Sequence, residues 1–145
     1  MTDVDDLRRV VDAMHAATGT VHWLGADGLL HVGAIIGDFP PPVLDAIRVI
    51  PVGKGLAGLA AERRECVTVC NLQSDASGEA RPGARATGME GAITAPCIDS
   101  AGVLRGVIGV ANATARTFSD AEQAALMGHG RRLADARAGR DGTPR

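Results

Sequence analysis

Two short turns constrain the fold of this chain more than any other feature of its sequence. They are residues 26–28 (Ala-Asp-Gly) and residues 99–102 (Asp-Ser-Ala-Gly). Each turn lies between two apolar, strand-like segments, which are residues 20–24, 29–36, 92–98 and 103–111. A short turn of this kind between two such segments is typical of a β-hairpin, whose strands pair antiparallel. The sequence therefore predicts an α+β fold in which a largely antiparallel sheet carries helices on its faces.

Helical patterns occur before, between and after these hairpins. The predicted helices are residues 3–18, 43–49, 55–64 and 120 to about 138. Thr2 or Asp3 can cap the first helix, and Gly19 can end it. Ser119 and Glu122 form a capping box at the start of the last helix, in which each side chain bonds a free backbone N–H group.

The remaining segments complete a single domain. Residues 51–55 are predicted to form a turn, and residues 66–70 a strand. Residues 71–91 are rich in glycine and have little periodicity, and a loop of this length is usually functional or disordered. A chain of 145 residues is long enough for one core. We therefore expect one domain over residues 1–138 and a flexible tail over residues 139–145.

Charge and composition exclude several classes of function. The formal net charge is −2, whereas a protein that binds nucleic acid through its phosphates needs a basic excess. Aromatic residues make up only 2% of the chain, too few for a platform that stacks bases. No apolar stretch approaches the ~18 residues of a membrane span, and the acidic N-terminus is unlike a signal peptide. We expect a cytoplasmic protein without nucleic-acid or membrane partners.

Several motifs, in a specific order, resemble those of GAF domains. Residues 50–58, Ile-Pro-Val-Gly-Lys-Gly-Leu-Ala-Gly, resemble the signature of the family. Residues 67–69 (Val-Thr-Val) and 95–96 (Ala-Pro) follow as they do in that family. Residues 103–110 resemble its fifth strand, and Phe118-Ser119 followed by Glu122 resembles the entry to its last helix.

This resemblance covers roughly residues 20–135 and implies a fold and two possible roles. The implied fold has a central antiparallel sheet of five or six strands with the terminal helices on one face. On the other face, helices and loops close over a small-molecule pocket. The two implied roles are reduction of free methionine sulfoxide by cysteines, and binding of a small ligand that is reported to a partner protein.

The cysteines do not match the pattern of the enzyme. A reductase needs a thiolate nucleophile and a second thiol that resolves it. Ala57 stands where the reductases have one cysteine, and residues 71–96 contain none where the attacking cysteine lies. Cys66 and Cys70 would be about 13 Å apart in one strand, too far for a disulfide. We interpret these two and Cys97 as small buried hydrophobic residues and expect no catalytic residue.

No metal or cofactor site is predicted either. His15, His22, His31 and His129 are scattered, and no pair of them has the spacing of metal ligands. His22 should share a strand face with Thr20, which is not a useful co-ligand. The neighbourhood of Lys54 lacks the Ser/Thr and the glycine spacing of a phosphate-binding loop.

The helix predicted at residues 55–64 offers a binding site at its start. Its first N–H groups are unpaired, and the helix dipole favours negative charge there. Small residues let a ligand approach the backbone, which suits a small anion better than a nucleotide. The arrangement resembles the nitrate-receptor GAF proteins of two-component systems, although Arg81 replaces the aromatic residue beside their loop proline. The candidate ligand-binding residues are Trp23, Lys54, Gly55, Leu56, Ala57, Asp75, Arg81, Pro82 and Ile93.

The sequence supports three hypotheses for function. The preferred one is a non-catalytic sensor that binds a small ligand, such as nitrate, under a lid at residues 71–91 and signals to a partner such as a histidine kinase. The second is a thiol enzyme of the methionine-sulfoxide type. The third is an interaction module in which the first helix and the helix containing Leu126 and Leu133 pair across the axis of a homodimer.

Overall fold

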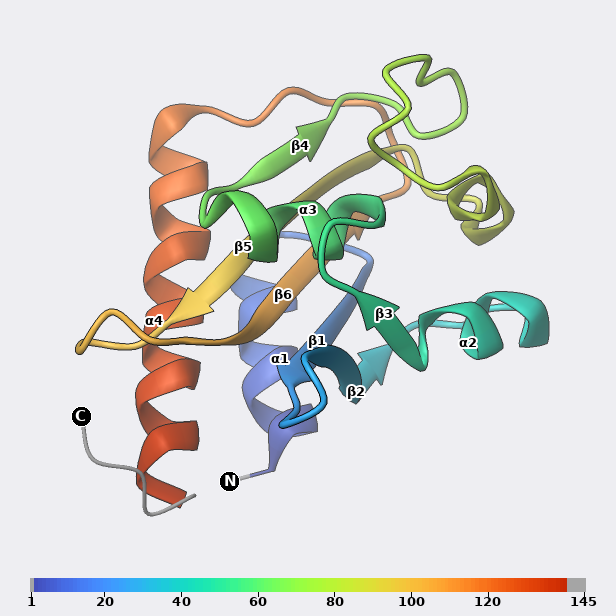
Figure 1. Cartoon of the computed structure of the whole chain (residues 1–145). Helices are drawn as coiled ribbons and strands as arrows, with labels where there is room; N and C mark the ends of the chain where they lie inside the picture. Colours follow the sequence, from blue (N-terminus) through green and yellow to red (C-terminus); the bar gives the residue numbers. More distant parts are fainter. Residues whose placement is uncertain (1, 141–145) are drawn as a thin grey trace.

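Six strands form one sheet in the computed structural model, which describes residues 2–140 of the chain. The strands are β1 (Thr18–Leu24), β2 (Leu29–Ile36), β3 (Val49–Pro51), β4 (Val67–Val69), β5 (Gly91–Ile98) and β6 (Leu104–Asn112). Their order across the sheet is β3-β2-β1-β6-β5-β4, and every neighbouring pair is antiparallel (Figure 1). The predicted antiparallel sheet with two hairpins is confirmed.

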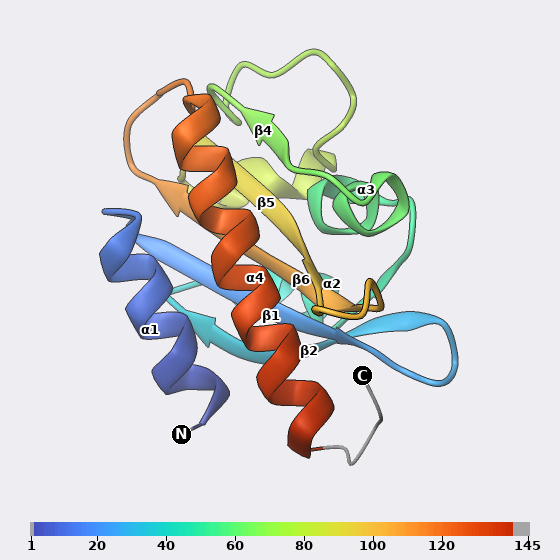
Figure 2. The same ribbon diagram turned by 90° about the vertical axis from the view of Figure 1, so that its left-hand side faces the viewer.

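Helices cover both faces of this sheet. They are α1 (Asp3–Ala13), α2 (Pro41–Ile47), α3 (Gly55–Arg63), the 3-10 helix η1 (Pro82–Thr87) and α4 (Asp120–Arg140). The terminal helices α1 and α4 lie side by side on one face, and α2, α3 and η1 lie on the other (Figures 1 and 2). This is the layered α+β arrangement that the sequence predicts.

The turns and helix starts form where the sequence places them. Gly28 and Gly102 adopt φ angles of +78° and +84° in the two hairpin turns, a conformation that glycine adopts without steric cost. At α1, the Asp5 amide donates to the Thr2 hydroxyl while the Asp5 carboxylate accepts from the Thr2 amide. At α4, Ser119 and Glu122 make the corresponding pair of bonds at 2.9 and 3.1 Å.

The first helix ends earlier than predicted. The expectation that it extends to residue 18 is wrong, because α1 ends at Ala13. The chain reverses at His15, which has a φ angle of +53°, and Thr18 already pairs with Ala111 of β6. Pairing with a central strand therefore outweighs the helical periodicity of these residues.

The second helix and the last helix also have different bounds. The predicted helix over residues 43–49 begins at Pro41 and stops at Ile47, because Val49 and Ile50 pair with His31 and Leu30 of β2. This short edge strand is not predicted from the sequence, and its final residue begins the predicted turn at 51–55. Helix α4 continues two residues past its predicted end, and the rest of the predicted tail, residues 141–145, lies outside the described residues.

The main core lies between the sheet and the two terminal helices. Its fully buried members include Leu7 of α1, Val21 of β1 and Ile108 of β6. Leu126 and Leu133 of α4 are only 0% and 2% exposed in this core. These two leucines therefore pack within the chain itself and are not available to a second copy, and the predicted homodimer stays a prediction. None of the helices described between residues 2 and 140 combines the length and the apolar character that a bilayer crossing requires.

Candidate functional site

A cavity of about 290 Å³ lies between the sheet and the helices on its other face. Strands β1, β5 and β6 form its floor, while α2, the start of α3 and the segment around η1 form its walls. The apolar side chains that line it include Phe39, Val43, Ile47, Ile50, Leu56, Ala57, Leu72, Ala84, Met89, Ala92 and Val110. Such a hollow, mostly apolar with a few polar groups, is the usual form of a small-molecule site.

Alternation along β1 and β5 decides which residues reach this cavity. Thr20 and His22 of β1 and Thr94 of β5 line it. Trp23 and Ile93 occupy the alternate positions and belong to the core beneath α1 and α4. The expectation that Trp23 and Ile93 line the ligand site is therefore wrong, because neighbouring residues in a strand point to opposite faces of the sheet.

Trp23 instead connects the sheet to both terminal helices. Its indole N–H donates to the Asp3 carboxylate of α1 at 3.0 Å. The Arg137 guanidinium of α4 lies 5.0 Å from the centre of its ring, within the range of a cation–π contact. Trp23 has a structural role on the packed face of the sheet.

Four of the predicted site residues do come together at the start of α3. Lys54, Gly55, Leu56 and Ala57 all line the cavity. The helix has no side-chain cap at Lys54, so its first N–H groups are not used by a capping side chain. Gly55 has a φ angle of +68°, and a Cβ atom there would lie 3.1 Å from the Arg81 side chain. Glycine therefore lets Arg81 lie directly over the start of the helix.

The predicted lid contributes a large part of the cavity wall. Leu72, Ala84 and Met89 are lining residues from residues 71–91, and η1 packs against α2. Gln73 holds this segment together, because its side-chain amide donates to the carbonyls of Arg85 and Met89 at 3.1 and 2.8 Å. The segment is thus folded over the cavity and contains the short helix η1 that the sequence did not predict.

The lid segment contains three of the predicted ligand-binding residues, and they do not all line the cavity. Arg81 lines the cavity, and Pro82 begins η1, although its side chain lies outside what the structure describes. Asp75 does not line the main cavity. Its carboxylate accepts hydrogen bonds from the Ser77 hydroxyl and amide at 2.9 and 3.1 Å, and the Ser77 hydroxyl bond is the main reason that its pKa is lowered. Asp75 therefore stabilises a local turn.

His22 is a cavity residue that the sequence analysis did not select. Its side chain is 2% exposed, and Nε2 lies 2.7 Å from the Ile47 carbonyl, so Nε2 carries the proton and donates. Burial lowers the pKa of His22, which favours the neutral form, and Nδ1 has no hydrogen-bond partner among the described residues. The one signal in the sequence was the shared strand face with Thr20.

The cysteine thiols lie away from the cavity. Cys97 is fully buried in the core on the α4 side, where burial raises its pKa. Cys66 donates to the Gln123 carbonyl at 3.5 Å, and burial, with a smaller effect of Glu65, raises its pKa to about 11. Cys70 is exposed. None of the three lines the cavity within residues 2–140, and the same residues contain no group of three or more potential metal ligands.

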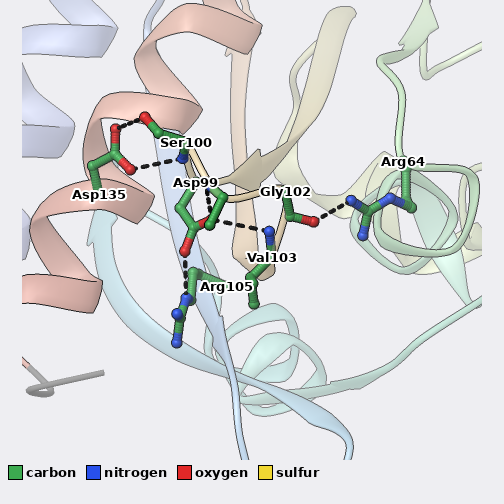
Figure 3. Close-up of polar contacts among 8 residues, drawn as sticks. Arg64, Asp99, Ser100, Gly102, Val103, Arg105 and Asp135 are labelled. Carbon is green, nitrogen blue, oxygen red and sulfur yellow. Dashed lines mark hydrogen bonds and ion pairs between the residues drawn. The ribbon is translucent and has the colours of Figure 1, made fainter. Parts of the chain in front are cut away.

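Outside the cavity, a cluster of polar side chains lies at the β5–β6 turn (Figure 3). The Asp99 carboxylate accepts from the Val103 amide and the Arg105 guanidinium at 2.9 and 3.0 Å. Ser100 donates to Asp135 of α4 from both its amide and its hydroxyl. On the other side, Arg64 at the end of α3 donates to the Gly102 carbonyl at 2.6 Å. These side chains bind groups of the chain itself and hold the turn between the two helical layers.

Comparison with known proteins identifies the family to which this fold and cavity belong. A family model described as a GAF domain matches residues 5–136. The chain belongs to the GAF domain family. No protein with a curated description is similar enough in sequence to match.

Solved structures with the same fold come from several kinds of protein. A GAF domain from a phosphoenolpyruvate-protein phosphotransferase of Coxiella burnetii is 21% identical, with a TM-score of 0.72 over 94% of this chain and 81% of that one. A domain assigned to a two-component sensor histidine kinase of Sinorhizobium meliloti is 15% identical, with a TM-score of 0.74 over 95% and 90%. The free methionine-R-sulfoxide reductase of Neisseria meningitidis, in complex with its substrate, is 16% identical, with a TM-score of 0.74 over 97% and 78%. At these identities the likeness shows the fold alone.

Proposed function

We propose that this GAF domain is a non-catalytic sensor that binds a small anionic ligand in its cavity. The observation that carries the proposal is the cavity itself: about 290 Å³ of mostly apolar space, with Lys54 and Arg81 in its lining and no cysteine among the described lining residues. Such a site binds and orients a molecule but offers no thiolate to react with it. Nitrate is one anion of this kind.

Ligand binding would be transmitted through the segments that close the cavity. A bound molecule would contact α2, the start of α3 and the lid segment at the same time, because all three contribute lining residues. A ligand shifts a conformational equilibrium by the difference between its affinities for the two states. We propose that the bound ligand favours the state in which the lid is closed over the cavity. A partner such as a sensor kinase would then recognise the changed surface. A homodimer, in a cytoplasmic setting, remains part of this proposal.

The thiol reductase is a second candidate because a free methionine-R-sulfoxide reductase shares the fold. Cys97 is the thiol to test. It is on β5, a strand that forms part of the cavity floor, but its side chain lies in the core. We expect no methionine-sulfoxide turnover above background in an NADPH-coupled assay. Turnover that disappears in Cys97→Ser would establish the enzyme and overturn the sensor proposal.

Titration calorimetry with nitrate, nitrite, chloride and iodide tests whether the cavity binds a small anion. We expect saturable binding that Leu56→Asp abolishes, because this change adds negative charge to the cavity lining. Leu59→Asp is the matched control, since Leu59 is in the same helix and is absent from the described cavity lining. Retained binding in Leu56→Asp would show that the anion binds elsewhere, and circular dichroism checks that both variants are folded.

A further inference from the structure

We propose, as an extension of the proposed function on which it rests, that the ligand is a small organic anion with an apolar body and no positively charged group. A monocarboxylate of about ten non-hydrogen atoms has these properties. The volume of the cavity, the chemistry of its walls and the sign of its charges each support one part of this description.

The volume sets the size of the ligand. A cavity of about 290 Å³ lies at the small end of the range for small-molecule sites, about 300–1,000 Å³. A four-atom anion such as nitrate would therefore leave most of the space to water or empty. Because the walls are mostly alanine, valine, isoleucine, leucine and phenylalanine side chains, displacing water from them favours binding. A ligand that fills the cavity with carbon atoms gains this free energy, and nitrate does not.

The charged side chains of the cavity lining determine the charge that we expect on the polar group of the ligand. Lys54 and Arg81 line the cavity, and the described part of the lining contains no aspartate or glutamate. Neither cation has an ion pair with any residue in the described range 2–140. By contrast, Arg63, Arg105 and Arg116 are each paired with a carboxylate. Other cations such as Arg8 also lack an ion pair among the described residues, so it is their place in the cavity lining that makes Lys54 and Arg81 the cations that a ligand would meet.

Both side chains also belong to the part of the cavity at the start of α3. Lys54 immediately precedes α3, and the aliphatic part of Arg81 lies over Gly55, the first residue of that helix. A carboxylate near them would face two positive side chains and the first N–H groups of α3. The apolar body would then extend over Thr94 and Ala92 of β5 toward α2.

The same lining disfavours other ligand classes. An ammonium group, as in a free amino acid, needs an anionic or carbonyl partner to replace its water, and no carboxylate is present among the described lining residues. A nucleobase is usually read by paired donors and acceptors of amide or carboxylate side chains, and no Asn, Gln, Asp or Glu side chain occurs there. His22 adds no third positive charge, because its burial lowers its pKa and favours the neutral ring, whose Nε2–H donates to the Ile47 carbonyl.

Two series of probes test the ligand class directly. One has an aromatic body (phenylacetate, phenylacetamide, phenethylamine) and the other an aliphatic body (hexanoate, hexanamide, hexylamine). Binding is measured by titration calorimetry, and the site is located from NMR shifts of the Leu56 and Ala57 amides. We expect at least one carboxylate to bind at least tenfold more tightly than its amide, its amine and nitrate, and to shift both amides.

Charge variants separate the mechanism from nonspecific attraction. Lys54→Gln and Arg81→Gln should each weaken carboxylate binding about three- to tenfold and leave amide binding unchanged. Arg8→Gln is the control, because it removes the same charge from an exposed position on α1, on the opposite side of the sheet. An equal loss in all three variants would show that net charge alone is responsible and would overturn the proposed contacts.

The outcomes distinguish this inference from the proposed function. An amide or amine that shifts the Leu56 and Ala57 amides as strongly as the carboxylate would overturn the ligand class and leave the sensor cavity intact. Failure of all six probes and nitrate to shift either amide would overturn the cavity as a ligand site, and the proposed function with it.

Discussion

Side chains of the same strands have very different surroundings on the two faces of the sheet. Toward α1 and α4, Val21, Ile93 and Ala95 are each 0% exposed and lie in one continuous core. Toward α2 and α3, Thr20 of β1 and Ala92 and Thr94 of β5 line a cavity of about 290 Å³. The first face is packed throughout, whereas the second is hollow at the cavity and packed beneath α3, around Leu30, Ala60 and Val107.

This difference separates the residues that stabilise the fold from those that are free to bind. Packed interiors are close to the density of organic crystals, so a change of even one methylene group affects stability there. Residues around a cavity can change with a smaller effect on stability and a larger effect on binding.

Truncating a leucine should cost far more on the packed face. Leu126→Ala removes a side chain that is 0% exposed, and we expect the free energy of unfolding to fall by about 2–5 kcal/mol because a cavity forms. The matched variant Leu56→Ala enlarges an existing cavity, and we expect a loss of about 1 kcal/mol. Urea denaturation measures both. Equal losses would mean that the cavity closes in solution.

Adding atoms should separate the two faces of β5. Ala95→Leu places a larger side chain in the filled core, and overpacking of this kind costs about 1–3 kcal/mol. Ala92→Leu adds the same atoms to the cavity lining, so we expect little change in stability but complete loss of carboxylate binding. Thermal unfolding and calorimetric titration of the two variants test this. The comparison fails if Ala92→Leu is the more destabilised of the pair.

The buried histidine of the hollow face should make stability depend on pH. Burial lowers the pKa of His22 in the folded state, so below about pH 6.5 the unfolded chain binds a proton that the folded chain does not. The free energy of unfolding should therefore fall from pH 7 to pH 5, by at most about 1.4 kcal/mol per pH unit for this group. Denaturation curves at several pH values measure the slope.

Two substitutions separate His22 from the other histidines. His22→Gln should reduce this slope, whereas His15→Asn, which removes an exposed histidine, should leave most of it. His129 of α4 acts in the same direction, because partial burial also lowers its pKa. Identical slopes in wild type and His22→Gln would show that the ring of His22 is not buried in solution.

The smallest predicted effect on stability compares two glycines on different sides of α4. A Cβ atom on Gly130 would lie 2.8 Å from the Pro96 carbonyl oxygen of β5, whereas a Cβ atom on Gly128 would meet nothing within 4 Å. Gly128→Ala should therefore stabilise the protein by up to about 1 kcal/mol, because alanine is the better helix former. Gly130→Ala should destabilise it by forcing the helix away from the sheet. Differential scanning calorimetry compares the two, and opposite signs are the expected result.

Local sequence signals predicted which elements form the site more accurately than which residues line it. The glycine-rich turn at residues 53–55 correctly indicated a helix start, and Lys54, Gly55, Leu56 and Ala57 do line one cavity. Trp23 and Ile93 were assigned to the wrong face, and His22 was missed. Seven of the eight residues of β5 are buried, so this strand lacks the alternation of apolar and polar residues that would reveal its two faces.

The sequence by itself determined the hairpins, the capped helix starts and the antiparallel sheet, because turn glycines and capping side chains act within a few residues of their own position. Only the tertiary structure decided the end of α1, the pairing of β3 and the direction in which each strand residue points. These features depend on contacts between distant segments, such as Thr18 with Ala111 and Ile50 with Leu30. A sheet covered by helices on both sides buries both sets of side chains, so the cavity face emerges only when the two layers are in place.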